Sequence, residues 1–371
     1  MDLGEIRSQI DDIDRQLSTL FQRRMALSVA VSEYKRQNNL PVLDMGRERA
    51  VIAAAEASAE DENLKPGLRR FFEGIMAESR LLQQNALLAS HDDRPAFPTV
   101  ESVAYLGPEG SFSHEALGRH FGPDARTVPF VSFEDAVEAV TRGQCRYGIL
   151  PVENSLTGGV FAVTDLLAKG SVRIVGETVM PVRHCLLAVP GAVASDIRMV
   201  LSHPQPLEQC RQFILRKGYD TAAFSSTAGA AAEVARREDI SVAAIASEQA
   251  GKLHGLVPLA HDIQDNPANF TRFAIVSGSD MPFEGADKIS AVFVVEHRPG
   301  TLYGALRAFA DRGINLMNLV SRPVPGSPWQ YCFHMDFNGN LTEPAVQEAL
   351  KEAGENCRSI LILGNYKKWE G

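Results

Sequence analysis

The chain has 371 residues and a net charge of −9, from 46 acidic and 37 basic side chains. This length suits two or three domains, and the composition is that of an ordinary soluble globular protein. The charge argues against a nucleic-acid-binding protein, because there is no basic excess to neutralise phosphates. It leaves room for a small anionic substrate, because a local cationic pocket can exist on an acidic protein.

The sequence also argues against a metal-binding protein and against a secreted or membrane-spanning one. The five cysteines are scattered and form no Cys-x-x-Cys pair, which fits reduced thiols and gives no metal signature. The N-terminus lacks the apolar core of a signal peptide, and no apolar segment is long enough to span a bilayer. We therefore expect a cytoplasmic protein that works without a metal, a cofactor, a membrane or nucleic acid.

The N-terminal region predicts a helical domain. Apolar residues recur at alternating steps of three and four from Leu3 to Tyr34 without a proline. This pattern predicts one helix of about 50 Å that packs against a partner chain. Arg24 fills a seam position where an apolar residue is expected, and a buried arginine needs an anionic partner. Arg7 and Lys35 flank the seam, although each alone also fits a surface residue whose stem covers the core.

Two shorter helices are expected after this one. Asp44, Arg47 and Glu48 would share one face of the second helix, although Asp44 also fits an N-cap with Arg47 as its helix partner. Ser79 and Gln83 continue the apolar side of the third helix, where buried polar groups need partners. Together with the three cations, these side chains suit a small dianion that carries a hydroxyl.

This pattern resembles the all-helical chorismate mutase domain over residues 1–90. In that family two protomers interlock through the long first helix. The resemblance implies that Arg24 and the partner subunit's Arg7 bind the substrate carboxylates, and that Lys35 and Gln83 face the ether oxygen. The other residues implied to contact the ring hydroxyl or line the pocket are Asp44, Arg47, Glu48 and Ser79.

A polar, proline-containing linker at 90–99 leads to a region where short apolar strands alternate with helical patterns, the mark of βαβ units on parallel sheets. Strands are expected at 103–106, 147–152, 199–201, 222–224 and 242–246. Several of them end in small or hydroxyl residues before a helix starts, and helix N-termini at strand ends bind anions. We expect an anion-binding cleft, and the lack of a G-x-G-x-x-G or Walker loop argues against nucleotide binding.

The run from Asp265 to Phe273 is a further candidate, because an Asn-Pro turn there enters an apolar strand over 270–277. Thr271 and Arg272 are neighbours at its start, so one side chain can face a cleft while the other binds the protein. From the residues alone, the region could be a solute-binding module, a LysR-type effector domain or an enzyme.

The same region resembles the prephenate dehydratase catalytic domain through segments in matching order and spacing, at 107–113, 151–155, 202–206, 225–227 and 269–273. The resemblance implies a two-lobed, periplasmic-binding-like α/β domain over 101–279. It implies that Thr271 contacts the leaving hydroxyl and that Glu153 and Asn154 shape the pocket. His203 fits an acid no better than a structural turn residue. The remaining substrate-binding candidates are Ser111, Ser155, Ser225 and Arg272.

Residues 287–366 predict a ferredoxin-like βαββαβ domain. Its strands are expected at 288–296, 315–320, 329–337 and 359–363, and its helices at 301–311 and 342–353. The pattern resembles an ACT domain, which binds an amino acid at a subunit interface. Thr301 and Val320 stand where that family has alanine and glutamate, and the domain could instead serve only dimer packing. The regulatory candidates are Gly300, Thr301, Leu302, Ser321, Arg322 and Pro323.

In this order, the three parts resemble the bifunctional chorismate mutase–prephenate dehydratase family, the P-proteins. The resemblance implies a homodimeric enzyme of phenylalanine biosynthesis that converts chorismate to prephenate and prephenate to phenylpyruvate, with inhibition by L-phenylalanine. Two alternatives stay open: a monofunctional dehydratase whose helical domain only dimerises the chain, and a non-catalytic sensor of aromatic acids.

Overall fold

The computed structural model describes residues 2–37, 45–89, 102–278, 285–324 and 330–369. Its internal contacts divide the chain into two compact units, Met1–Arg94 and Pro95–Gly371. Within the described ranges, no helix has both the length and the apolar character that a bilayer crossing requires.

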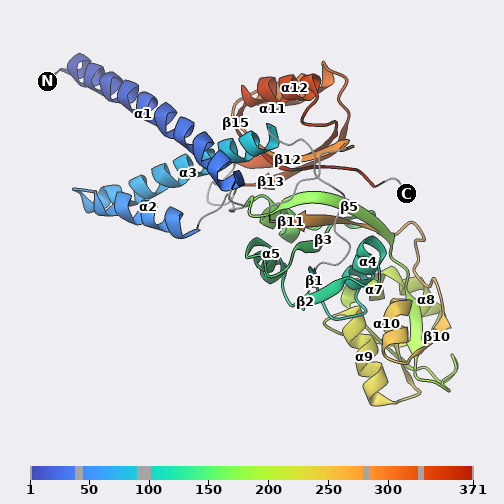
Figure 1. Ribbon diagram of the computed structural model, residues 1–371. Helices are drawn as coiled ribbons and strands as arrows, with labels where there is room; N and C mark the ends of the chain where they lie inside the picture. The colour runs from blue at the N-terminus through green and yellow to red at the C-terminus, as the bar shows by residue number, and fades with distance from the viewer. Residues whose placement is uncertain (1, 38–44, 90–101, 279–284, 325–329, 370–371) are drawn as a thin grey trace. The chain divides into compact units, whose positions relative to one another are not determined.

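The N-terminal unit is helical, as predicted. Its long helices are α1 (Leu3–Gln37), α2 (Met45–Ala57) and α3 (Lys65–Ala89), drawn in blue in Figure 1. A short 3₁₀ turn, Glu62–Leu64, precedes α3. α3 packs against both α1 and α2, so it forms the centre of the unit.

The apolar seam predicted on α1 is exposed in this single chain. Its side chains keep between 41% and 68% of their accessible surface, namely Leu3, Ile6, Ile10, Ile13, Leu17, Leu20 and Leu27. A continuous stripe of this kind is typical of a surface that another chain covers, because exposed apolar area is costly in water.

The second unit begins with a lobe built on a sheet of order β2-β1-β3-β11-β5, in which the short β4 also pairs with β3. The elements of this lobe are β1 (Ser102–Leu106), α4 (Phe112–Phe121), β2 (Arg126–Phe130), α5 (Phe133–Thr141), β3 (Tyr147–Asn154), β4 (Gly158–Gly159), α6 (Phe161–Leu167), β5 (Arg173–Pro181) and β11 (Phe270–Ser277).

Two expectations for this lobe are wrong. β1 is parallel to β2 and β3, but β11 is antiparallel to both β3 and β5. The sheet is therefore mixed, because β11 is the strand by which the chain returns from the second lobe. In addition, the loop after β3 does not lead straight into a helix, since Glu153 and Asn154 pair with β4 in a hairpin that precedes α6.

The second lobe has a sheet of order β10-β6-β9-β7-β8, in which β9 is buried along its whole length. The elements are β6 (Cys185–Ala188), β7 (Met199–Ser202), α7 (Pro204–Gln209), α8 (Arg211–Lys217), β8 (Asp220–Ala223), α9 (Thr227–Arg237), β9 (Val242–Ala246), α10 (Glu248–Leu253) and β10 (Val257–Ala260). The two-lobed α/β prediction is confirmed, although sequence patterns do not indicate β2, β5, β6 or β10.

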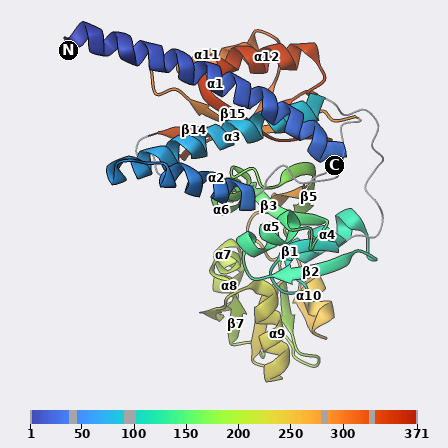
Figure 2. The same ribbon diagram turned by 60° about the vertical axis from the view of Figure 1, so that its left-hand side comes forward.

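The C-terminal domain has the predicted βαββαβ order. Its sheet runs β13-β14-β12-β15, and α11 and α12 lie side by side against it (Figure 2). The elements are β12 (Lys288–Val295), α11 (Thr301–Ala310), β13 (Leu316–Pro323), β14 (Tyr331–Asn338), α12 (Pro344–Gly354) and β15 (Cys357–Tyr366). The ferredoxin-like arrangement is confirmed.

This domain is packed directly against the first lobe through β15 and β5. At the closest point the glycine backbone of Gly364 lies so near Ile174 that a Cβ atom on it would stand 2.1 Å from the Ile174 carbonyl oxygen. Only glycine allows two backbones to approach so closely.

Candidate active sites and the C-terminal domain

Arg24 lies where α1 meets α3. Its Nη1 donates to the hydroxyl of Ser79 and, at 3.4 Å, to the carbonyl oxygen of Ile75. Ser28 Oγ donates to Ser79 Oγ at 3.0 Å, which holds the serine in place. Burial lowers the pKa of Arg24, and repulsion from the nearby Arg47 cation lowers it further. In the described part of this unit, Arg24 forms no ion pair with a carboxylate, so its cation is a candidate to bind an anion from outside the chain.

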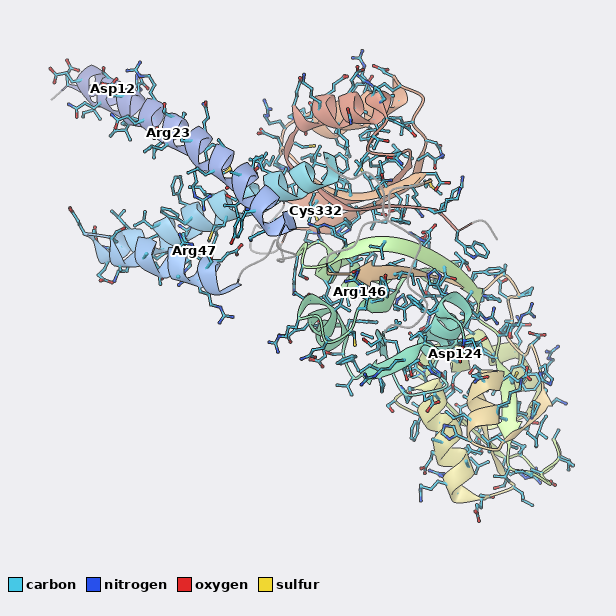
Figure 3. The ribbon with its side chains drawn as sticks, viewed as in Figure 1. Asp12, Arg23, Arg47, Asp124, Arg146 and Cys332 are labelled. Atoms are coloured by element: carbon cyan, nitrogen blue, oxygen red, sulfur yellow. The ribbon has the colours of Figure 1, made fainter. Side chains whose placement is uncertain are left out.

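The other predicted mutase residues are distributed along the unit. Gln83 is buried one turn beyond Ser79 on α3, and its Oε1 has no hydrogen-bond partner among the described residues. Lys35 and Glu48 are half-buried, Arg47 is exposed on α2 (Figure 3), and Asp44 lies outside the described residues.

Arg7 is far from Arg24 in the same chain. Both residues are on the unbroken helix α1, and seventeen residues at 1.5 Å each separate them by about 25 Å. Arg7 is exposed in this single chain. A ligand bound at Arg24 could therefore meet an Arg7 side chain only from a second copy.

In the second unit, Asn154 and Thr271 are opposite each other on β3 and β11. Asn154 is 8% exposed and Thr271 is half-buried. The Asn154 Nδ2 donates to Thr271 Oγ1 at 3.1 Å and to Asn269 Oδ1 at 2.7 Å. The three residues form a hydrogen-bonded set, which we call the Asn154 network.

The orientation of the Asn154 amide follows from its other contacts. Its Oδ1 accepts from the backbone N–H groups of Leu156 at 3.0 Å and Thr157 at 3.1 Å, and those groups can only donate. Nδ2 must then face Thr271, and Thr271 Oγ1 must accept. The Thr271 hydroxyl proton, which has no acceptor among the described residues, is free to be donated to a ligand.

Asn269 begins the matching segment 269–273, and the sequence pattern assigns it no role. Its side chain is fully buried, its Oδ1 receives the Asn154 bond, and its Nδ2 has no partner among the described residues. A buried amide with an unused donor beside Thr271 is a candidate for ligand contact. No periodicity could reveal it, because its partner is 115 residues away in the sequence.

The predicted serine donors differ in what they bind. Ser155 Oγ donates to the carbonyl of Ala268 at 2.7 Å and accepts from the Phe270 N–H at 2.9 Å, so it closes the loop before β11. Ser111 is the N-cap of α4. Ser225 is exposed, and its neighbour Ser226 is the N-cap of α9.

Further N-caps in the second lobe place polar side chains at helix starts. His203 caps α7 through Nδ1, which accepts from the Gln205 N–H at 3.3 Å, so this histidine has a structural role. Ser247 caps α10, and its hydroxyl also donates at 3.0 Å to the Gly110 carbonyl in the first lobe. The two lobes therefore meet where α4 and α10 begin.

Glu153 and Arg272 lie on the face of the sheet opposite the Asn154 network. They are paired in the strand register, and Arg272 Nη2 is 2.9 Å from Glu153 Oε2. Arg272 Nη2 also lies 2.9 Å from Asp336 Oδ2 of the C-terminal domain. The geometry thus separates these two predicted site residues from Thr271 and brings them to the domain boundary.

The regulatory candidates lie in two places, at the start of α11 and on β13. Gly300 has φ +85° and precedes α11, and the Thr301 hydroxyl lies 2.6 Å from the Glu296 carbonyl oxygen, its acceptor, which fixes the turn. Leu302 is half-buried, whereas Ser321 and Pro323 are exposed on β13.

Arg322 binds the first lobe instead of facing solvent. Its guanidinium pairs with Asp165 on α6 at 2.6 Å and lies over the ring of Phe161, 4.4 Å from the centroid. The hydrogen bond from Arg322 holds the pKa of Asp165 below its ordinary value.

In the described residues, no group of histidine, cysteine and acidic side chains could hold a metal ion.

Family models match three consecutive segments of the chain. They are described as Chorismate mutase type II, over residues 6–84, Prephenate dehydratase, over residues 103–281, and ACT domain, over residues 289–355. The bifunctional chorismate mutase/prephenate dehydratase of Enterobacter agglomerans is 33% identical, over 97% of this chain and 95% of that protein.

Two solved structures are similar to a large part of the chain. A prephenate dehydratase from Arthrobacter aurescens in complex with L-Phe is 34% identical with a TM-score of 0.66, and the match covers 72% of this chain and 89% of that one. A structure described as GqqA, a novel type of quorum quenching acylase, is 34% identical with a TM-score of 0.67, covering 72% of this chain and 98% of that one.

The fold and these matches define a multidomain enzyme that joins a helical mutase domain, a two-lobed dehydratase domain and an ACT domain. The match to a chorismate mutase model and to bifunctional relatives favours two activities over a dehydratase whose helical domain only dimerises the chain, and over a sensor. The chain belongs to the bifunctional chorismate mutase/prephenate dehydratase family.

Proposed function

We propose that the Asn154 network is the centre of the dehydratase site and that Thr271 donates a hydrogen bond to the departing hydroxyl of prephenate. Loss of that hydroxyl with one added proton yields water, while the ring carboxylate leaves as carbon dioxide and the ring becomes aromatic. A positioned donor assists the first event. The single observation that carries this proposal is the amide orientation described above, which leaves the Thr271 proton without an acceptor among the described residues.

Ser111 and Ser225 remain proposed donors to the substrate carboxylates, since both lie at starts of helices whose N–H groups favour anions. Ser155 supports the site indirectly through the loop before β11. Glu153 and Arg272 are assigned to the domain boundary in this proposal, because their side chains bind each other on the opposite face.

For the mutase reaction, we propose that Arg24 binds a chorismate carboxylate while Lys35 and Gln83 face the ether oxygen. The rearrangement breaks the ether C–O bond and forms a C–C bond without a proton transfer, so compact positioning and donors at the ether oxygen suffice. The cation of Arg24, which pairs with no carboxylate among the described residues, supports this assignment. Buried Gln83 would donate to the ether oxygen through its Nε2 group.

The remaining mutase assignments follow the family pattern. Orientation of the ring hydroxyl and the pocket is assigned to Asp44, Arg47, Glu48 and Ser79. The second carboxylate is assigned to the partner subunit's Arg7, because one chain cannot bring both arginines together. We accordingly propose a homodimer that covers the α1 seam.

We also propose L-phenylalanine as an inhibitor that binds the C-terminal domain near the regulatory candidates. The named L-Phe complex of the similar dehydratase supports the ligand class. The proposed domain limits are 1–90, 101–279 and 287–366, and the proposed compartment is the cytoplasm, where the free thiols of the described cysteines would stay reduced.

One experiment tests both sites. Purified protein is given chorismate, and chorismate loss and phenylpyruvate formation are followed together, with and without L-phenylalanine. Phenylpyruvate formation supports both assignments. Accumulation of prephenate would refute the dehydratase site, and unchanged chorismate with turnover of added prephenate would reduce the helical unit to a dimerisation element.

A further inference from the structure

Arg272 is the centre of an ion cluster at the boundary between the dehydratase lobe and the C-terminal domain. Its Nη1 lies 3.2 Å from Glu177 Oε2 on β5, and its Nη2 lies 2.9 Å from Asp336 Oδ2 on β14. Lys288 Nζ, on β12, lies 2.7 Å from the same Glu177 oxygen and 3.7 Å from the same Asp336 oxygen. With Glu153, these residues form what we call the boundary cluster.

The ion pairs of the boundary cluster link the dehydratase lobe to the C-terminal domain in both directions. Glu177 and Arg272 belong to the dehydratase lobe, whereas Lys288 and Asp336 belong to the C-terminal domain. Each carboxylate thus bridges one cation from its own domain and one from the other. Moving the domains apart would separate both bridges at once.

These charges are buried, which makes their separation costly. The side chains of Lys288, Glu177, Asp336 and Arg272 are 3%, 5%, 12% and 17% exposed. A buried charge that loses its partner is strongly destabilising, because water cannot replace the partner. Burial alone would lower the pKa of Arg272, but attraction from Asp336, Glu177 and Glu153 raises it above its ordinary value, so the guanidinium stays charged.

Further contacts fix the carboxylates. Ser290 Oγ donates to Asp336, and the backbone N–H of Trp369 donates to Glu177 Oε1 at 3.1 Å. The close approach of Gly364 to β5 adds a backbone contact at the same boundary. A displacement of the C-terminal sheet would therefore pull on Arg272 instead of being absorbed by loose side chains.

We propose that Asp336 is a positioning residue of the dehydratase site, which acts through Arg272 on the adjacent Thr271 and makes turnover depend on the C-terminal domain. This inference rests on the proposed role of Thr271. Because Thr271 and Arg272 are consecutive in β11, a shift or rotation of the strand at Arg272 also moves Thr271 Oγ1 relative to Asn154. A misplacement of about 1 Å at a reacting centre can cost about a hundredfold in rate.

The test is Asp336→Asn in the full-length protein. Asparagine keeps the shape and an acceptor for Ser290, but it removes the charge that bridges Arg272 and Lys288. We expect dehydratase kcat to fall at least tenfold with KM changed less than threefold, and mutase kcat to stay within twofold. We also expect half-inhibition to need at least tenfold more L-phenylalanine, while calorimetry shows its binding retained. Asp336→Glu, which keeps the charge, should recover part of the lost kcat.

Two matched variants separate this role from general weakening of the domain. Asp165→Asn breaks the other described ion pair between the domains, at Arg322, and Glu352→Gln breaks the pair with Arg312 inside the C-terminal domain. Both should leave dehydratase kcat within twofold. An equal loss in Asp165→Asn would overturn the specific role of Asp336, as would normal kcat in Asp336→Asn.

The parent protein is assayed first with prephenate. No turnover by the parent refutes the proposed function and this inference with it, whereas turnover by the parent and by Asp336→Asn alike refutes this inference alone. If Asp336→Asn does not fold, the comparison is made with Ser290→Ala, which frees the same carboxylate from one bond and should give a smaller loss of kcat. Unchanged kcat in Ser290→Ala would then overturn the inference.

Discussion

The helical unit and the dehydratase lobe present their polar groups in different ways. In the helical unit, the Arg24 cation lies beside hydroxyl and carbonyl groups, and a long apolar seam faces solvent nearby. In the dehydratase lobe, the Asn154 amide uses both its oxygen and its nitrogen within the same chain. The Thr271 hydroxyl proton has no acceptor in the part of the chain that the structure describes. We propose that the first arrangement binds an anion and that the second is a preorganised hydrogen-bond donor.

The contrast matches the chemistry proposed for each unit. A rearrangement without proton transfer needs charge that holds a dianion in a compact shape, and a loose surface can supply part of it from a second copy. Departure of a hydroxyl needs one donor in one orientation, and a single folded chain fixes this best. The two activities should therefore respond independently to mutation.

The largest expected effect is the loss of mutase activity in Lys35→Ala. Removal of the proposed donor to the ether oxygen should lower kcat by about a thousandfold or more, since such electrostatic stabilisation is a leading contribution to catalysis. Chorismate consumption and prephenate consumption are measured in the same preparation. Loss of both activities in folded protein would contradict the separation of the two sites.

Thr271→Ala should have the reciprocal effect. Loss of the hydroxyl removes the proposed donor and should lower dehydratase kcat by about a thousandfold, within the range found for general acid groups. Mutase activity should not change. A nearly normal rate with prephenate would remove Thr271 from the site, and Thr271→Ser, which keeps a hydroxyl, is the matched control.

A smaller loss is expected for Asn154→Asp. The carboxylate would keep the bonds from Leu156 and Thr157, but its second oxygen would accept the Thr271 proton instead of donating to Thr271 Oγ1. Misdirection of the donor should cost about a hundredfold in dehydratase kcat. If Asn154→Asp is as active as the parent, then the amide orientation does not control the site.

A charge placed on the α1 seam should affect the helical unit and leave the dehydratase lobe unchanged. Leu17→Asp should disrupt a surface that a second copy covers, so mutase activity should fall at least tenfold and become dependent on protein concentration. Dehydratase kcat should change less than twofold. The control is Asp12→Asn on the same helix (Figure 3), which breaks only an exposed pair with Arg15 that contributes little. Equal sedimentation of Leu17→Asp and parent would argue against the dimer.

The smallest effect concerns the pH dependence of stability at His334. Burial lowers its pKa, with a smaller lowering by Arg322 that Asp165 and Asp336 oppose. The unfolded chain protonates this histidine near pH 6.5 whereas the folded chain does so at lower pH, so stability falls as pH drops from 6.5 towards the folded-state pKa. His334→Gln should make the melting temperature less sensitive between pH 7.5 and 5.5. An identical slope would exclude this contribution.

The sequence predicts those parts of the fold whose pattern is local. The proline-free heptad pattern predicts α1, and the apolar runs of β1, β9 and β11 identify those strands. β5 does not have such a run, because Arg173 and Glu177 are buried in it. Their burial depends on partners from other segments, which a single sequence does not show.

In the candidate site, too, a local pattern predicts some positions, whereas others depend on contacts between distant segments. Alternation along β11 shows that Thr271 and Arg272 must face opposite ways, and the structure has them so. The position of Glu153 could not be derived in this way, because it depends on the register between β3 and β11, whose residues are 119 positions apart. Asn269, Lys288 and Asp336 escape prediction for the same reason.

The contact between Gly364 and Ile174 has a consequence for protein engineering. Deleting the C-terminal domain to obtain an enzyme that escapes the proposed inhibition by L-phenylalanine would remove the strand that covers β5. It would also leave Glu177 and Arg272 without Lys288 and Asp336. Truncated forms should therefore be poorly folded or poorly active. Feedback-resistant forms are better sought among point substitutions in the effector site, with residue 364 kept as glycine.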